Sequence, residues 1–118
     1  MTQYQVGKRF EDKVRNHLRI DGYEVIRAAG SKTKADLVAL KPGQLLLVQC
    51  KRHGVIPAAE WDRLVEIAGW VDAVPVLAVN GPKGRGVVYW RLTGRKVRGR
   101  PMSGQPVLRF VTDEAVTA

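Results

Sequence analysis

The stretch DLVALKPGQLLLVQCK, residues 36–51, decides the fold because it places two apolar runs around one turn. Pro42 fixes its own φ and Gly43 tolerates a positive φ, so this pair is a turn signal. The flanking runs, Asp36–Leu40 and Leu45–Lys51, are rich in Leu and Val and are typical of strands. The stretch therefore predicts a β-hairpin in which the numbers of paired residues sum to 85.

This register predicts a polar face at one end of the hairpin. Asp36 faces Gln49, and residues two apart on a strand share a face, so Lys51 joins them while Cys50 points the other way. Carboxylate and amide oxygens suit Mg²⁺, which takes one or two protein carboxylates and fills its shell with water and phosphate. The Lys51 ammonium would hold an attacking water or stabilise charge on a phosphoryl group. Each residue alone also has a plain structural role, as a cap or a solvated strand end.

Helical and strand patterns flank the hairpin. Apolar residues recur every four positions from Val6 to Leu18 and predict a helix that ends at Gly22. Further segments are predicted as strands, at Tyr23–Ala28, Val74–Val79 and Val87–Leu92, and as a second helix, at Ala58–Val71. The order α-β-β-β-α-β-β predicts an α/β fold with one mixed sheet flanked by helices.

Length and composition are those of one folded domain. The 118 residues suit a single core, which we place at residues 1–93. Residues 94–118 form a basic extension rich in Gly, Pro and Arg, either part of the same domain or partly mobile. The single cysteine, Cys50, excludes an internal disulfide, and no apolar stretch is long enough to span a membrane. We therefore expect a cytoplasmic protein without a membrane partner.

The charge balance favours a polyanionic partner. Lys and Arg number 20 against 11 Asp and Glu, which gives a net charge of +9 and a pI near 10.2. Residues 73–112 contain eight basic and no acidic residues. Such a balance indicates nucleic acid, although ribosomal and membrane-surface proteins share it.

Four segments resemble archaeal-type Holliday junction resolvases, which belong to the PD-(D/E)XK, or restriction-endonuclease-like, nucleases. They are GKRFE at 7–11, GYEVIRAAGS at 22–31, ADLVAL at 35–40 and VQCK at 48–51. The resemblance implies a restriction-endonuclease-like mixed sheet and a homodimer that cuts four-way DNA junctions by paired nicks. It also implies Mg²⁺ as cofactor, with Mn²⁺ as a substitute and no small-molecule cofactor, in a bacterial, archaeal or phage-infected cell.

The resemblance also implies roles for individual residues. Glu11 matches the helix glutamate that assists metal binding, Asp36 the direct metal ligand, Lys51 the catalytic lysine and Ser31 the loop serine near the scissile phosphate. Gln49 departs from the pattern because an amide stands where the family has an acid. Its oxygen can still bind a metal, but it brings no charge and cannot act as a base. This favours one metal over a symmetric two-metal site.

Junction recognition is expected to rest on phosphate contacts, which position DNA without reading its sequence. The candidate cations are Lys8, Arg9, Lys32, Lys34, Arg52, Lys83, Arg85, Arg95, Lys96, Arg98 and Arg100. Four apolar residues of the second helix, Trp61, Leu64, Ala68 and Trp70, either cover the sheet or pair two protomers.

Three alternatives stay open on the sequence. The chain could be a nucleic-acid-binding module that lost catalysis through Gln49, or a repair or replication nuclease that acts on flaps, ends or duplex DNA. It could also be a ribosomal-type RNA binder. Metal-dependent strand cleavage separates the nucleases from the binders, and a panel of substrates separates the nucleases from each other.

Overall fold

The computed structural model describes residues 2–28 and 35–110. Over these residues the elements, in chain order, are α1 (Gln3–Ile20), β1 (Glu24–Arg27), β2 (Leu37–Lys41), β3 (Gln44–Cys50), α2 (Ala58–Trp70), β4 (Val74–Asn80), the 3-10 turn η1 (Pro82–Gly84), β5 (Val87–Leu92), the 3-10 turn η2 (Met102–Gly104) and β6 (Val107–Phe110). None of the helices in this part of the chain is both long and apolar enough to cross a membrane.

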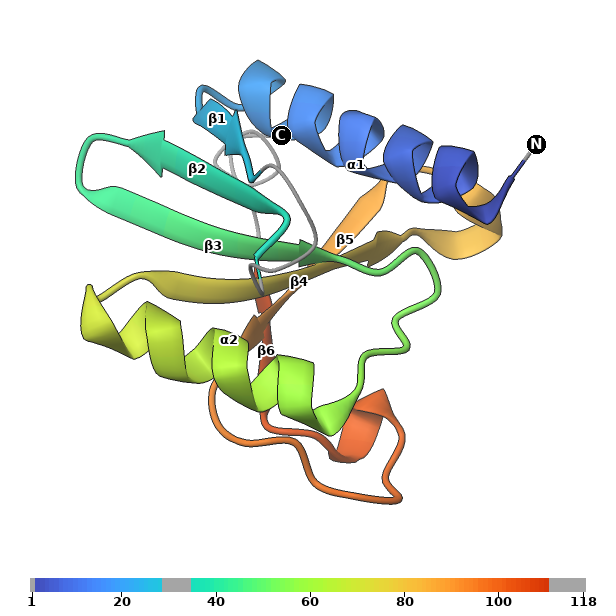
Figure 1. The fold of residues 1–118 in the computed structure, drawn as a ribbon, viewed down its shortest axis with the longest axis vertical. Helices are drawn as coiled ribbons and strands as arrows, with labels where there is room; N and C mark the ends of the chain where they lie inside the picture. The colour runs from blue at the N-terminus through green and yellow to red at the C-terminus, as the bar shows by residue number, and fades with distance from the viewer. Residues whose placement is uncertain (1, 29–34, 111–118) are drawn as a thin grey trace.

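The strands form one sheet in the order β1-β2-β3-β4-β5-β6. The β3–β4 pair is parallel, and the other neighbouring strands are antiparallel. Helix α2 connects β3 to β4, and the two helices cover opposite faces of the sheet (Figure 1). The predicted mixed α/β sheet is thus confirmed. Strand β6, which pairs with β5, was not predicted.

The hairpin has the predicted register. Leu37 pairs with Val48 and Leu40 pairs with Leu45, so the numbers of each pair sum to 85. Gly43 adopts a φ of +77°, the conformation that the Pro-Gly turn requires. The turn residues therefore fix which side chains of β3 face each helix.

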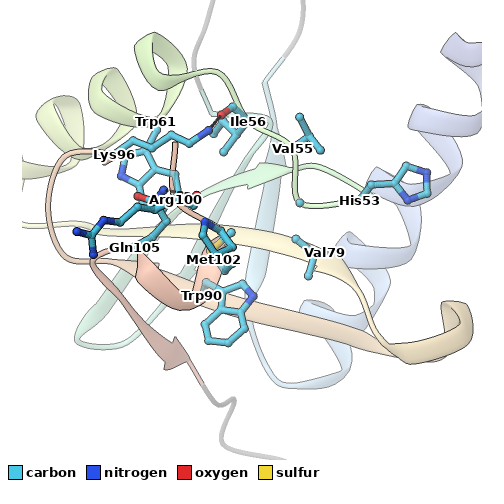
Figure 2. Close-up of a pocket in the computed structure, with 12 residues that line it drawn as sticks. His53, Val55, Ile56, Trp61, Val79, Trp90, Lys96, Arg100, Met102 and Gln105 are labelled. Carbon is cyan, nitrogen blue, oxygen red and sulfur yellow. Dashed lines mark hydrogen bonds between the residues drawn. The ribbon is translucent and has the colours of Figure 1, made fainter. Parts of the chain in front are cut away.

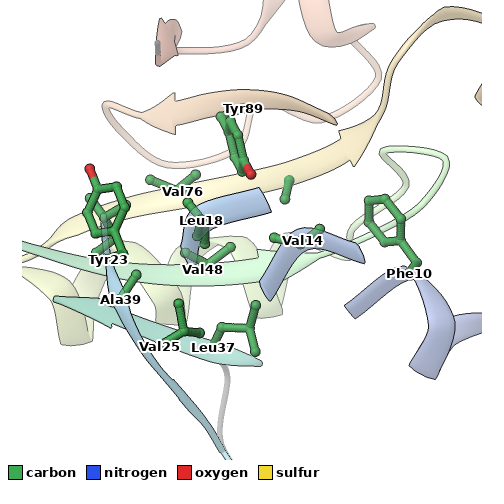
Figure 3. Packing of buried hydrophobic residues seen from close by; sticks show 12 residues of the cluster. Phe10, Val14, Leu18, Tyr23, Val25, Leu37, Ala39, Val48, Val76 and Tyr89 are labelled. Carbon is green, nitrogen blue, oxygen red and sulfur yellow. The ribbon is translucent and has the colours of Figure 1, made fainter. Parts of the chain in front are cut away.

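One face of the sheet is packed by α1. Phe10, Val14 and Leu18 are buried against apolar residues of the sheet, among them Val48 and Tyr89 (Figure 3). The helix begins with a capping box formed by Thr2 and Gln5 and ends at Ile20, with Asp21 as its C-cap. Gly22 follows with a φ of +96°, so the predicted helix end is confirmed.

The other face is packed by α2. Trp61, Leu64 and Ala68 are fully buried, and the indole Nε1 of Trp61 donates a hydrogen bond to the Gly94 carbonyl at 2.7 Å. These three side chains cover the sheet and are not available to pair protomers. Trp70, at the end of α2, is 65% exposed.

The basic segment between β5 and β6 folds back on α2. The buried side chain of Gln105 bonds the backbone of Val97 and the carbonyl of Arg100, which closes a compact loop. Asp62 of α2 accepts a hydrogen bond from the Lys96 amide at 2.9 Å. Part of the predicted extension, up to Phe110, is therefore packed against the domain.

Candidate functional site

Asp36 lies immediately before β2, beside the end of β3. Its amide donates to the Val48 carbonyl at 2.8 Å, and its Oδ2 accepts a hydrogen bond from the Cys50 amide at 2.8 Å. The side chain thus takes the place of a backbone acceptor at the end of the ladder. A carboxylate offers about four lone-pair positions, so this bond leaves capacity for another ligand.

Gln49 projects from the opposite side of β3 to Cys50. It pairs with Leu77, which belongs to the α2-side core, while Cys50 packs against the α1-side core. Gln49 is 7% exposed, and its Oε1 is buried without a hydrogen-bond partner. A buried acceptor without a partner costs about 1–3 kcal/mol and calls for a specific explanation, such as a bound ion.

Lys51 follows β3 and is held by both its backbone and its side chain. Its amide donates to the Ala78 carbonyl at 3.0 Å, and its Nζ lies 3.1 Å from Oε2 of Glu60 in the first turn of α2. Both side chains are about 30% exposed. Glu60 was not singled out in the sequence, because no motif or spacing links it to the hairpin.

Glu11 approaches the same site from α1. It forms an ion pair with Arg27 at 3.6 Å, and burial raises the pKa of its carboxyl, with the charge of Asp36 as the second cause. The pKa of Asp36 is also raised, chiefly by burial, and the Cys50 amide and Lys51 partly oppose this shift. The negative charge of Asp36 therefore opposes the ionisation of Glu11.

The donor set fits one divalent cation of the magnesium type. Across residues 2–28 and 35–110, no three His, Cys, Asp or Glu side chains gather closely enough to hold a metal. Mg²⁺ needs only one or two protein carboxylates, and the unpartnered Oε1 of Gln49 offers a further hard oxygen on the residue before Cys50, whose amide bonds Asp36. Asp36 and Gln49 would hold such an ion, with Glu11 adding charge.

Three predicted residues cannot be placed. Ser31, Lys32 and Lys34 lie outside the described residues. Their predicted roles, as the loop serine near the scissile phosphate and as phosphate contacts, remain predictions.

Several predicted DNA contacts do gather in space. Arg9 of α1 and Arg52 line one surface hollow, and Arg52 and Lys83 line an adjoining one. Lys13, which was not predicted, fastens the η1 loop to α1 through bonds to the Asn80 side chain and the Gly84 carbonyl, each at 2.9 Å. The predicted cations that are exposed are Lys8, Arg9, Lys83, Arg85, Arg95, Arg98 and Arg100.

A separate cavity of about 420 Å³ opens on the α2 side of the sheet (Figure 2). Its lining includes Trp90, Met102 and Arg100, all near the folded-back basic segment. Lys96 also borders it, but its Nζ donates to the Ile56 carbonyl at 2.6 Å. Lys96 therefore anchors the loop before α2 to the basic segment, unlike the exposed cations.

The mixed sheet, with an acid, an amide and a lysine at the end of β3, defines the chain as an α/β domain of the restriction-endonuclease-like class. The comparisons with known proteins narrow this class. The family model of the archaeal Holliday junction resolvase (Hjc) matches residues 2–93, and the chain belongs to this family.

Individual relatives agree with the family. The chain is 31% identical over 82 residues to the crossover junction endodeoxyribonuclease Hjc of Methanocaldococcus jannaschii, a match that covers 66% of this chain and 61% of that protein. It thus spans about three fifths of this curated relative. The solved structure of Archaeoglobus fulgidus Hjc, a Holliday junction resolvase, superposes with a TM-score of 0.60 at 26% identity, over 75% of this chain and 79% of the other.

Proposed function

We propose that the chain is a metal-dependent endonuclease that resolves four-way DNA junctions by paired hydrolysis of phosphodiesters. The observation that carries this proposal is the gathering of Asp36, Gln49 and Lys51 at the end of β3, in a chain of the Hjc family. An endonuclease relative at 31% sequence identity and a solved Holliday junction resolvase structure with a TM-score of 0.60 support it.

The residues of the site have different roles in the proposed reaction. Asp36 and Gln49 would hold Mg²⁺, or Mn²⁺ in its place, and Glu11 would add negative charge near Asp36. Bound Mg²⁺ would polarise a phosphoryl oxygen of the substrate. Lys51 places its ammonium where charge develops on the phosphoryl group. The fixed backbone of Lys51 and its ion pair with Glu60 hold that ammonium in position.

DNA would lie across the basic hollows near the site. Arg9, Arg52 and Lys83 come from three different segments, so together they can follow a phosphate backbone. Contacts of this kind fix the position of the DNA and recognise its shape. We therefore expect junction binding that weakens steeply as the salt concentration rises.

We further infer that the active form is a homodimer, since two symmetric nicks need two equivalent sites. Trp70 and Val71 are adjacent large apolar residues at the end of α2 and are more than half exposed, and we take them as candidates for this interface. A charged residue in place of Leu64 would not test this interface. It would unfold the protein, because the Leu64 side chain is fully buried. A Trp70→Glu variant that stays folded but sediments as a monomer would support this assignment, and unchanged sedimentation would contradict it.

The test of the proposed function is cleavage of a labelled synthetic four-way junction beside duplex, flap and single-strand controls. Each substrate is incubated with Mg²⁺, Mn²⁺ or EDTA, with Lys51→Ala as the inactive control. Paired symmetric nicks on the junction alone, dependent on metal and on Lys51, support a resolvase.

A binding module without catalysis is the second candidate, because Gln49 cannot supply the charge of the usual acid. It predicts salt-sensitive junction binding and no cleavage at any Mg²⁺ or Mn²⁺ concentration. Cutting of flaps or duplex as fast as junctions would point to the remaining alternative, a nuclease of broader repair function.

A further inference from the structure

Gln49 brings no charge to the site, and a carboxylate from another element, Glu60 of α2, lies beside Lys51. We propose that Glu60 is a positioning residue that fixes the Lys51 ammonium and returns a negative charge to the site, an inference that rests on the proposed function. Its carboxylate Oε2 lies 3.1 Å from Lys51 Nζ. No other Asp or Glu of the described residues forms an ion pair with Lys51.

The position of Glu60 is fixed by the backbone on both sides of it. The turn after β3 is closed by a hydrogen bond from the Gly54 amide to the Lys51 carbonyl at 2.8 Å. The loop then buries Ile56, whose carbonyl accepts the Lys96 ammonium, and Trp61 follows as a fully buried anchor. The separation between the backbones of Lys51 and Glu60 is therefore set by packing of the loop and of the first turn of α2.

One oxygen of the Glu60 carboxylate is shielded from water, although the side chain as a whole is about 30% exposed. Its Oε2 is buried, and it lies on the side of the sheet that carries Gln49. Burial raises the pKa of the Asp36 carboxyl, and the negative charge of Glu60 raises it further. The unpartnered Gln49 Oε1, in a side chain more than nine-tenths buried, is the independent sign that this region is built around a ligand.

A second ion pair on α2 provides a matched contrast. Glu66 and Arg63 are one turn apart at 2.7 Å, and both side chains are more than 40% exposed. Such surface pairs contribute little. Glu60 could also act only through the positive end of the helix dipole, since it lies in the first turn of α2. The experiment must separate this structural role from the proposed one.

The experiment compares Glu60→Gln, Glu66→Gln, Gln49→Glu and the double variant Gln49→Glu with Glu60→Gln. The affinity of each metal-free protein for Mn²⁺ is measured by titration calorimetry, and kcat and KM are measured on the four-way junction. Circular dichroism melting reports whether each variant is folded. Glu66→Gln is the control, because the same chemical change is made on the same helix away from the site.

We expect Glu60→Gln to lower Mn²⁺ affinity and kcat about tenfold with little change in KM, and Glu66→Gln to change neither. The double variant should recover most of both losses, because it returns one carboxylate to the site. A loss through the helix dipole would lower the melting temperature and would not be rescued by a charge at position 49.

Several results would overturn the inference. The first is that Glu60→Gln has the same Mn²⁺ affinity and kcat as Glu66→Gln. The second is that the double variant recovers neither quantity. The third is that the wild-type protein does not bind Mn²⁺. A different result would contradict the proposed function alone. In that case the wild-type protein would cut no junction, but its Mn²⁺ affinity would still fall in Glu60→Gln and recover in the double variant.

Discussion

The two faces of β3 differ most at its last residues. Val48 and Cys50 face α1 and pack into a continuous apolar core. Gln49 and the following Lys51 face the other way and bring a buried unpartnered oxygen and an ion-paired ammonium. Alternate residues of this strand therefore serve stability and chemistry, and the buried unpartnered oxygen of the strand lies on the chemical face.

The largest effect should come from the chemical face. Asp36→Asn removes the carboxylate charge that would bind the cation, so we expect a loss of cleavage of at least about a hundredfold with junction binding retained. The measurements are cleavage rates and gel-shift affinities. Asp72→Asn is the control, because Asp72 is exposed and precedes β4, which pairs with the opposite end of β3. Equal loss in both variants would contradict the role of Asp36.

Stability should depend more on the α1 face of β3 than on the face that carries Gln49. Leu46→Ala on the α1 face should lower the free energy of unfolding by about 2–5 kcal/mol, because it leaves a cavity in the core. Gln49→Leu should cost nothing or add about 1 kcal/mol, because it removes a buried acceptor that has no partner. Urea unfolding measures both. A large destabilisation by Gln49→Leu would show that the Gln49 amide has a structural role.

An acid at position 49 should strengthen metal binding on the chemical face of β3. Gln49→Glu adds a charged oxygen ligand, so we expect equal or higher cleavage at low Mg²⁺ and about a tenfold lower Mg²⁺ requirement. The measurement is the cleavage rate as a function of Mg²⁺ concentration. If Gln49→Glu damaged cleavage as severely as Asp36→Asn, the cation assignment would be wrong.

The smallest effect is a pH dependence of the metal-free protein. Burial raises the pKa of Asp36 above its ordinary value, so the folded state binds the proton more tightly than the unfolded state. This contribution to stability is complete below the unfolded pKa and is lost as the pH rises through the folded pKa. In EDTA, Asp36→Asn should therefore be more stable than wild type at pH 7, and the gap should shrink as the pH falls towards 4. A gap that widens in acid would contradict the shift.

The sequence was most informative where local chemistry determines the structure. The Pro42-Gly43 turn set the register of the hairpin, and the alternation of side chains along β3 placed Gln49 and Cys50 on opposite faces. The four-residue spacing from Val6 to Leu18 likewise predicted a buried helix face. In both cases the determining residues are neighbours in the chain.

The features that escaped prediction depend on contacts between distant segments. Strand β6 is four residues long, follows a Gly- and Pro-rich loop and forms by pairing with β5. Glu60 reaches Lys51 because the loop between them is folded by tertiary contacts, one of which comes from Lys96. No local pattern in the sequence encodes these distances.

The central claim is that the end of β3 is a cation site built from Asp36 and an amide. The most direct test is a crystal structure of the protein grown with Mn²⁺, with data collected to reveal the anomalous signal of manganese. We predict one anomalous peak within bonding distance of the Asp36 carboxylate and Gln49 Oε1. Manganese bound elsewhere, or a Gln49 Oε1 hydrogen-bonded to protein with no metal near Asp36, would contradict the account.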